Sequence, residues 1–196
     1  MNRFSQIEAS ISSCGRAIAG LGAQIALLEK TGQVLLDCFA RGGKVMTAGN
    51  GGSAAEALHL AEELIGRFKA DRPALPALAL VADPTALTCI GNDFGFDQIF
   101  RRQVEGLGRP GDVLVLFSTS GKSRNLTEAL EAARARQMVV IALLGGDGGH
   151  LKGRADFEIR VAADAPARVQ EAHQLIVHLW LELIEGEKFA GEYGKE

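Results

Sequence analysis

Short, nearly continuous apolar runs alternate along most of this chain with longer stretches whose apolar positions recur at helical spacing. The apolar runs are rich in Val, Ile and Leu, and they lie at 44–48, 76–82, 112–118, 138–144 and 156–161. Runs of this kind are typical of parallel strands that are buried on both faces. The helical stretches lie between and after them, at 53–69, 85–91, 96–107, 123–136 and 168–188.

The alternation of strand and helix predicts an α/β fold, a doubly wound and mostly parallel five-stranded sheet flanked by helices. In such a fold, ligands bind beyond the carboxyl ends of the strands. We expect this ligand-binding domain to occupy residues 41–196, after a separate helical segment over residues 1–40.

The N-terminal segment carries apolar residues whose spacing alternates between three and four. They are Phe4, Ile7, Ile11, Cys14, Ile18, Leu21, Ile25 and Leu28. This spacing is typical of helices that pack along their length, although Gly15, Gly20 and Gly22 weaken an isolated helix here. The seam fits two alternatives equally well, a core helix of the same domain or an oligomer interface.

Composition narrows the class of protein. The chain has 196 residues, is 47% hydrophobic and carries a net charge of −3; disorder is excluded, and without a basic tract we expect no nucleic-acid partner. Cys14, Cys38 and Cys89 form no metal or redox motif, and we interpret them as core residues of a reducing compartment. No targeting segment or uncharged apolar run of about 18 residues is evident, so we expect no membrane span and a cytoplasmic location.

Two polar loops follow predicted strands and lead directly into helices. The first is Ala48-Gly49-Asn50-Gly51-Gly52-Ser53, and the second is Ser118-Thr119-Ser120-Gly121-Lys122-Ser123. Glycines let a ligand approach the backbone, hydroxyls donate hydrogen bonds, and a helix N-terminus offers free N–H groups. The loops therefore predict a pocket for a small phosphorylated ligand.

Other interpretations of these loops are weaker. Ser53-Ala54-Ala55-Glu56 fits a capping box, which gives Ser53 a structural role whatever else it does. The first loop also fits a relaxed dinucleotide fingerprint, but the nearest acidic partner, Asp83, lies too far along the chain. A nucleotide P-loop is rejected because Leu116 stands where that motif needs glycine.

Ionisable residues gather on two of the predicted helices. His59 and Glu63 are four residues apart and share one helix face. On the last helix, residues 170, 174 and 178 (Gln, Gln and His) form one stripe, and His173 lies about 60° from it. A carboxylate and an imidazole beside a sugar phosphate could move a proton between adjacent carbons. A His/Glu/His set could instead bind zinc. We assign no role to His150.

Five runs, in this order, resemble the phosphoheptose isomerases of the sugar-isomerase (SIS) domain family. They are Gly49–Ser53, His59–Arg67, Gly91–Gly95, Ser118–Ser123 and the segment from Arg168 to His178. The resemblance covers nearly the whole chain, and it implies an SIS fold. It also implies conversion of sedoheptulose 7-phosphate to D-glycero-D-manno-heptose 7-phosphate through an enediol, an early step toward lipopolysaccharide heptose.

The resemblance further implies a role for each matching residue. Glu63 would be the catalytic base and His178 its partner acid. Zinc would be held by His59, Glu63, Gln170 and His178. The phosphate would bind Ser118, Thr119, Ser120 and Ser123. The remaining substrate contacts would come from Asn50, Gly51, Gly52, Ser53, Glu63, Arg67, Asn92, Asp93 and Gln170. The assembly implied is a homotetramer.

The chain departs from this family at two places. Ala54-Ala55-Glu56 replaces a more polar run, and Ala167 stands where a polar residue is usual. Ser53-Ala54-Ala55 and the run from Arg72 to Pro76 instead resemble a related SIS regulator that binds the replication initiator DnaA. That relative lacks the catalytic Glu and the second His, whereas this chain has both Glu63 and His178. We therefore favour catalysis, with initiator binding or another phosphosugar as alternatives.

Overall fold

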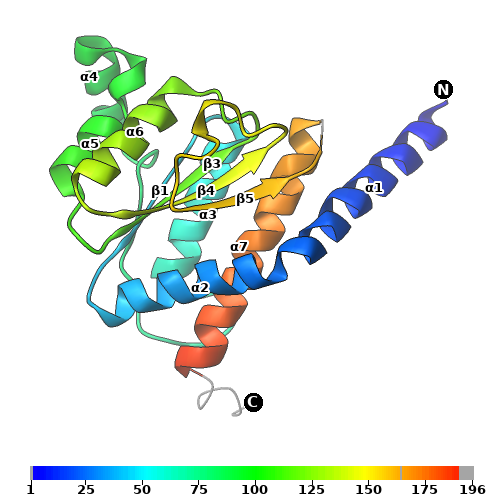
Figure 1. Ribbon diagram of the computed structural model, residues 1–196, viewed down its shortest axis with the longest axis horizontal. Helices are drawn as coiled ribbons and strands as arrows, with labels where there is room; N and C mark the ends of the chain where they lie inside the picture. The colour runs from blue at the N-terminus through cyan, green and yellow to red at the C-terminus, as the bar shows by residue number, and fades with distance from the viewer. Residues whose placement is uncertain (1, 164, 190–196) are drawn as a thin grey trace.

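The computed structural model describes residues 2–163 and 165–189, with side chains described through residue 186. Its centre is a five-stranded sheet (Figure 1). The strands are β1 Val45–Gly49, β2 Ala77–Ala79, β3 Val113–Ser118, β4 Val139–Gly145 and β5 Phe157–Val161. All neighbours pair in parallel, in the order β2-β1-β3-β4-β5. The predicted doubly wound sheet is confirmed.

Helices cover both faces of this sheet (Figure 1). The helices after the first strand are α3 Gly52–Ile65, α4 Pro84–Phe94, α5 Arg101–Leu107, α6 Arg124–Ala135 and α7 Pro166–Phe189. Short 3-10 turns lie at η2 Phe96–Gln98 and η3 Gly149–Leu151. The predicted helix 53–69 is too long, because α3 ends at Ile65, and the predicted helix 96–107 is divided into η2 and α5.

Two hydrophobic cores lie on the two faces of the sheet, and the strands supply both by alternation. In β3, Val113, Val115 and Phe117 pack with α3, α7 and the N-terminal helix α2 (Ile25–Ala40). Leu114 and Leu116 pack with α4, α5 and α6. Residues 113–117 are all fully buried. Burial on both faces explains why these strands appear in the sequence as continuous apolar runs.

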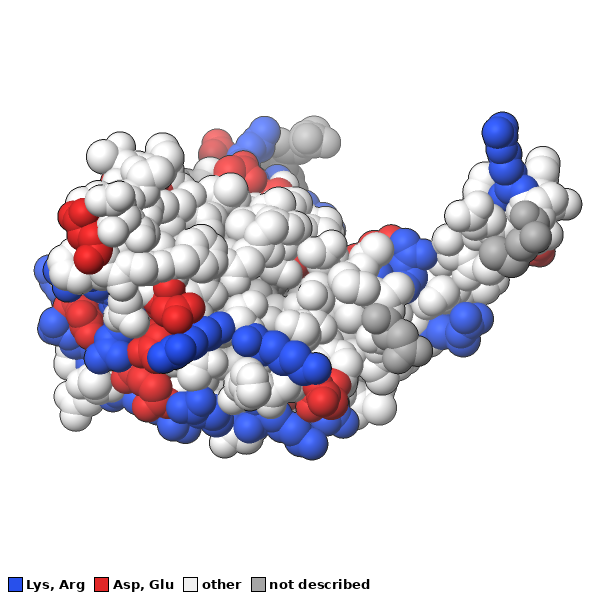
Figure 2. Space-filling view, turned by 90° about the horizontal axis from the view of Figure 1, so that it is seen from above, with Lys and Arg blue, Asp and Glu red and all other residues white. Residues whose placement is uncertain are grey.

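The N-terminal segment forms α1 Arg3–Ala19, the 3-10 turn η1 Gly20–Gln24, and α2 Ile25–Ala40. The predicted seam divides at η1. Leu21 and Leu28 enter the core, whereas Phe4 is 87% and Ile11 68% exposed. Figures 1 and 2 show α1 projecting from the body as an arm. The core alternative is therefore confirmed for Leu21 and Leu28, and an oligomer interface stays a prediction for the exposed apolar residues of α1.

The apolar character of this segment bears on whether the chain could span a membrane. By length and composition alone, the stretch Arg3–Ala40 could cross a membrane, because it contains an apolar window of 18 residues with no more than two charged residues. Core helices of soluble proteins pass the same test, so it is weak evidence. The absence of a span therefore stays a prediction. On the face seen in Figure 2, basic and acidic side chains are interspersed.

The three cysteines differ in burial. Cys38 is fully buried, and this burial raises the pKa of its thiol to about 11. Cys14 is half-buried and Cys89 is exposed. The prediction of a core cysteine is confirmed for Cys38 and wrong for Cys89, which lies on the outer surface of α4.

Candidate active site

The first polar loop turns sharply between β1 and α3. Gly51 has φ +57° and ψ −122°, a conformation that favours glycine. A Cβ on Gly49 would lie 2.2 Å from the carbonyl oxygen of Ser53. Gly51 is also the N-cap of α3, and no side chain caps this helix. The predicted capping box is therefore wrong: Ser53 lies within the first turn of the helix, and Glu56 is buried.

The second polar loop is closed by its own hydroxyls. The Ser118 oxygen accepts a hydrogen bond from the Gly121 N–H at 2.9 Å, and Ser120 accepts one from the Lys122 N–H at 3.2 Å. Both hydroxyl protons therefore remain to be donated. Ser123 is the N-cap residue of α6, but its side chain makes no capping bond. The loop thus presents hydroxyls beside a helix N-terminus, an arrangement that suits an anion.

An amide pair joins the two loops. Asn50 donates to the Asn125 oxygen at 2.9 Å, and Asn125 donates back to the Asn50 oxygen at 2.8 Å. Asn125 is buried in the first turn of α6. The predicted ligand contact Asn50 therefore also fixes the first loop against the start of α6, a role that only the fold reveals.

A second group of polar side chains lies further along α3 and α7. His59 Nε2 lies 3.2 Å from Glu63 Oε1, and the rings of His59 and His178 lie 5.4 Å apart at 72°. The Gln174 amide nitrogen, which can only donate, lies 3.1 Å from His178 Nε2. His178 therefore accepts through Nε2 in this arrangement. The sequence placed Gln174 on the same stripe as His178 but gave it no role.

Phe68 also contacts His178, and the sequence gave no sign of this contact. Its ring stacks on the imidazole with the centroids 5.3 Å apart and an angle of 26° between the planes. Phe68 follows the C-terminus of α3, in a segment that was predicted to be helical. The side chain therefore reaches the site only because the helix ends at Ile65.

The donor atoms of this group suit a zinc ion. Ligand atoms of His59, Glu62 and Glu63 lie within 4.8 Å of one another, and zinc accepts imidazole and carboxylate ligands. Gln170 does not join them within one chain. A Cβ on Gly52 would lie 2.3 Å from its amide nitrogen, and Gln170 precedes His178 by two helical turns, a rise of about 12 Å.

The remaining predicted substrate contacts are spread over the surface. Asn92 and Asp93 lie near the end of α4, where they hydrogen-bond to each other at 2.7 Å. Arg67 is exposed, beyond the C-terminus of α3. The first polar loop lies at the start of α3, and the Asn50–Asn125 pair joins it to the second loop at the start of α6. Glu63 lies eleven residues after Gly52, a rise of about 16 Å. One chain therefore keeps the polar loops and the ionisable group apart.

Known proteins match the chain in both sequence and structure. Residues 14–145 match the SIS domain family. The phosphoheptose isomerase of Akkermansia muciniphila is 47% identical over 176 residues, which cover 90% of this chain and 92% of that protein. That of Enterobacter sp. (strain 638) is 50% identical over 166 residues, with coverage of 84% and 86%. The chain belongs to the phosphoheptose isomerase family.

Solved structures of phosphoheptose isomerases agree. The structure from Francisella tularensis has a TM-score of 0.92 at 37% identity and covers 95% of this chain and 100% of that one. The structure from Neisseria gonorrhoeae has a TM-score of 0.89 at 40% identity, with coverage of 94% and 100%. The alternative of an initiator-binding regulator is not favoured by these relatives.

A buried polar pair, which the sequence did not reveal, lies between α3 and α7 of this phosphoheptose isomerase family member. His173 Nδ1 lies 3.7 Å from Glu56 Oε2, and the imidazole also meets the edge of Phe117 at 6.2 Å. Within the described residues, no group hydrogen-bonds to either side chain. Glu56 looked like a cap in the sequence, and only its contact with α7 assigns it to the interior.

Proposed function

We propose that this protein is a phosphosugar isomerase that converts sedoheptulose 7-phosphate to D-glycero-D-manno-heptose 7-phosphate. The observation that carries the proposal is the juxtaposition of Glu63 with the imidazoles of His59 and His178, from α3 and α7. Relatives at 45–50% identity bear the name phosphoheptose isomerase. An aldose–ketose isomerase needs one base at carbon and one acid–base group at oxygen, and this set contains both.

The proposed reaction is a pair of proton transfers. The Glu63 carboxylate removes a proton from C1 of the ketose while the C2 oxygen gains one, which gives an enediol with a C1=C2 double bond. Glu63 then returns a proton to C2 while the C1 hydroxyl loses its proton and becomes the aldehyde. His178 exchanges the protons on the two oxygens, since an imidazole can both take up and give back a proton near neutral pH.

The second polar loop would hold the substrate phosphate. Ser118, Thr119, Ser120 and Ser123 surround the start of α6, where backbone N–H groups and the helix dipole favour an anion. The first loop, with Asn50, Gly51, Gly52 and Ser53, would contact the sugar hydroxyls, together with Asn92 and Asp93. Arg67 would add a further contact.

We also propose a zinc ion at the ionisable group, with His59, Glu63 and His178 as ligands. When bound, zinc would polarise the sugar oxygens. Gln170 would complete the set only from a second copy of the chain, because it lies two turns away on α7.

The separation of the two groups supports a homo-oligomer, and we propose a tetramer in the cytoplasm that serves surface heptose synthesis. An extended seven-carbon phosphate spans about 9 Å from C2 to phosphorus, on bonds of about 1.5 Å. The first polar loop, which the Asn50–Asn125 pair joins to the phosphate loop, lies about 16 Å from Glu63 along α3. A complete site would therefore combine the loops of one chain with Glu63 of another. The exposed apolar residues of α1 offer a surface for such assembly.

A turnover assay tests the proposal directly. Purified protein with added zinc is incubated with sedoheptulose 7-phosphate and a panel of shorter ketose phosphates, and aldose formation is followed. We expect turnover of the heptulose and a loss of at least about 1,000-fold in Glu63→Gln, since the base at carbon is removed. Glu105→Gln, in an exposed ion pair on α5, is the matched control. Absence of heptulose turnover in the unmodified protein would refute the proposal.

A further inference from the structure

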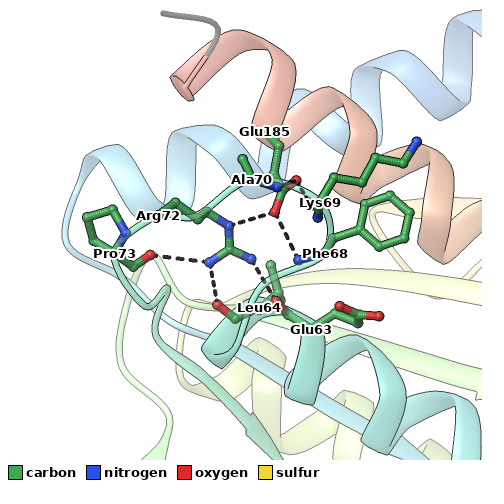
Figure 3. Close-up of polar contacts among 8 residues, drawn as sticks. All are labelled: Glu63, Leu64, Phe68, Lys69, Ala70, Arg72, Pro73 and Glu185. Atoms are coloured by element: carbon green, nitrogen blue, oxygen red, sulfur yellow. Dashed lines mark hydrogen bonds and ion pairs between the residues drawn. The ribbon is translucent and has the colours of Figure 1, made fainter. Parts of the chain in front are cut away.

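A buried ion pair ties the segment after α3 to the last helix (Figure 3). Arg72 Nε donates to Glu185 Oε1 at 3.0 Å, and neither side chain is exposed to solvent. Glu185 lies on α7, 113 residues after its partner. Removing two charges from water is costly, so such a pair is weak evidence for stability by itself. Its neighbours show what else it does.

Glu185 holds the backbone of the segment beyond α3. Its carboxylate accepts hydrogen bonds from the N–H groups of Phe68, Lys69 and Ala70 at 3.0, 2.9 and 2.9 Å. Successive backbone N–H groups around one anion form a nest, and hydrogen bonds to an ionised group are the strong ones. Figure 3 shows the segment wrapped around this carboxylate. The position of Phe68 is thus set from α7.

Arg72 holds the other side, the last turn of α3. Its guanidinium donates to the carbonyl oxygen of Glu63 at 2.6 Å and to that of Leu64 at 2.9 Å. The final carbonyl groups of a helix have no partner within the helix. Arg72 therefore caps the C-terminus of α3 and fixes the turn from which the Glu63 carboxylate extends.

Each member of the ion pair contacts backbone next to a proposed catalytic residue. Glu63 is the proposed base, and Phe68 stacks on His178, the proposed acid. Glu185 follows His178 by seven residues, so both lie on one face of α7, two turns apart. One ion pair thus joins the backbone that carries the base to the ring that orients the acid.

We infer that Arg72 and Glu185 are positioning residues that set the distance and angle between the Glu63 carboxylate and the His178 imidazole. This inference rests on the proposed isomerase activity. The pair touches no substrate, because both of its side chains are fully buried. Its loss should therefore slow proton transfer and leave phosphate binding nearly unchanged.

The test compares Glu185→Gln and Arg72→Lys with two matched controls. Glu182→Gln removes an exposed ion pair between the same helix and Lys69. Asp112→Asn breaks another buried carboxylate that accepts from Lys44 Nζ and from two backbone N–H groups, at the opposite end of the sheet from the loops. We expect kcat to fall about 10- to 100-fold in the two test variants, since misplacement by about 1 Å costs about that much. KM should stay within about twofold.

The controls separate positioning from stability. Asp112→Asn should lower the thermal midpoint but leave kcat at 25 °C unchanged, and Glu182→Gln should change neither. Phe68→Leu removes the stacking without touching the ion pair, so it should reproduce the loss of kcat even if the charge variants fail to fold. A full kcat in Phe68→Leu, or in folded Glu185→Gln, would overturn the inference.

A second readout does not need activity. The stacked Phe68 ring shifts the His178 imidazole resonances, and the chain has only four histidines to assign. At fixed pH, Glu185→Gln should move the His178 signals while Glu182→Gln leaves them in place. If the unmodified protein shows no turnover, the proposed function fails while this spectrum still decides the positioning role. Unmoved His178 signals in Glu185→Gln would refute that role.

Discussion

A complementation experiment addresses whether one chain or two form the active site. Two variants are made, each of which should be inactive for a different reason. Glu63→Gln removes the base and leaves the phosphate loop intact. Ser123→Asp places a carboxylate where the phosphate should bind, and it leaves α6 intact because Ser123 makes no capping bond and aspartate is itself a favoured N-cap.

The expected magnitude follows from the separation along α3. If each site takes its loops from one chain and Glu63 from another, a refolded equal mixture has an intact loop with probability one half and an intact base with probability one half. About a quarter of the sites should then be complete, so about a quarter of the activity of the unmodified protein should return from two inactive parents. A site within one chain would yield no recovery.

The assay is turnover of sedoheptulose 7-phosphate before and after joint refolding. Different affinity tags on the two variants show by co-purification that mixed oligomers have formed. Unfolded and refolded single variants are the controls for refolding yield. Mixed oligomers without activity above the sum of the parents would refute the argument that about 16 Å of helix keeps the two groups apart.

Three further predictions concern single residues. Asn125→Ala leaves the Asn50 amide unpaired at a partly buried position. It should therefore lower the free energy of unfolding, measured by urea titration, by about 1–3 kcal/mol and should raise KM. Unchanged stability would contradict the role of the pair. The raised pKa of Cys38, about 11 against 9.0, means that the neutral thiol stabilises the fold below pH 9 and that this contribution is lost as pH rises from 9 through 11. Cys38→Ala should remove that part of the alkaline loss, and Cys89, which is exposed, should react first with a thiol reagent.

The sequence predicted the sheet well because its strands are buried on both faces. β3 was predicted at 112–118 and is found at Val113–Ser118, since a continuous apolar run has few other solutions. The end of α3 was predicted four residues too late. Gly66, the C-cap of α3, was a local stop signal that the apolar pattern outweighed in the prediction. Glu185, more than a hundred residues away, accepts hydrogen bonds from the N–H groups of Phe68 and Lys69, and such a partner cannot be seen from local sequence.

The candidate site was predictable to the extent that helix geometry fixes it. His59 and Glu63 were expected on one face because they are four residues apart, and the structure confirms their contact. Their meeting with His178 depends on how two helices far apart in the sequence pack together, and only the family resemblance suggested it. The place of Gln170 beside Gly52 could not be foreseen, because the resemblance named a ligand set without saying which chain supplies each member.

The packing of α3 against α7 explains why these contacts hold together as one unit. The two helices touch at Gly52 and Gln170 and at His59 and His178. Arg72, which caps the end of α3, adds a third link through Glu185. A slip of α7 by one residue would move every side chain by about 1.5 Å and 100° and would break all three contacts together. At one end, Gln170 fits against α3 in this register only because Gly52 has no Cβ. At the other end, the buried Glu185 carboxylate must meet the Arg72 guanidinium. The relation of Glu63 to His178 is therefore set by the register of two helices, and substitutions at either end of that interface should affect catalysis without touching a reacting group.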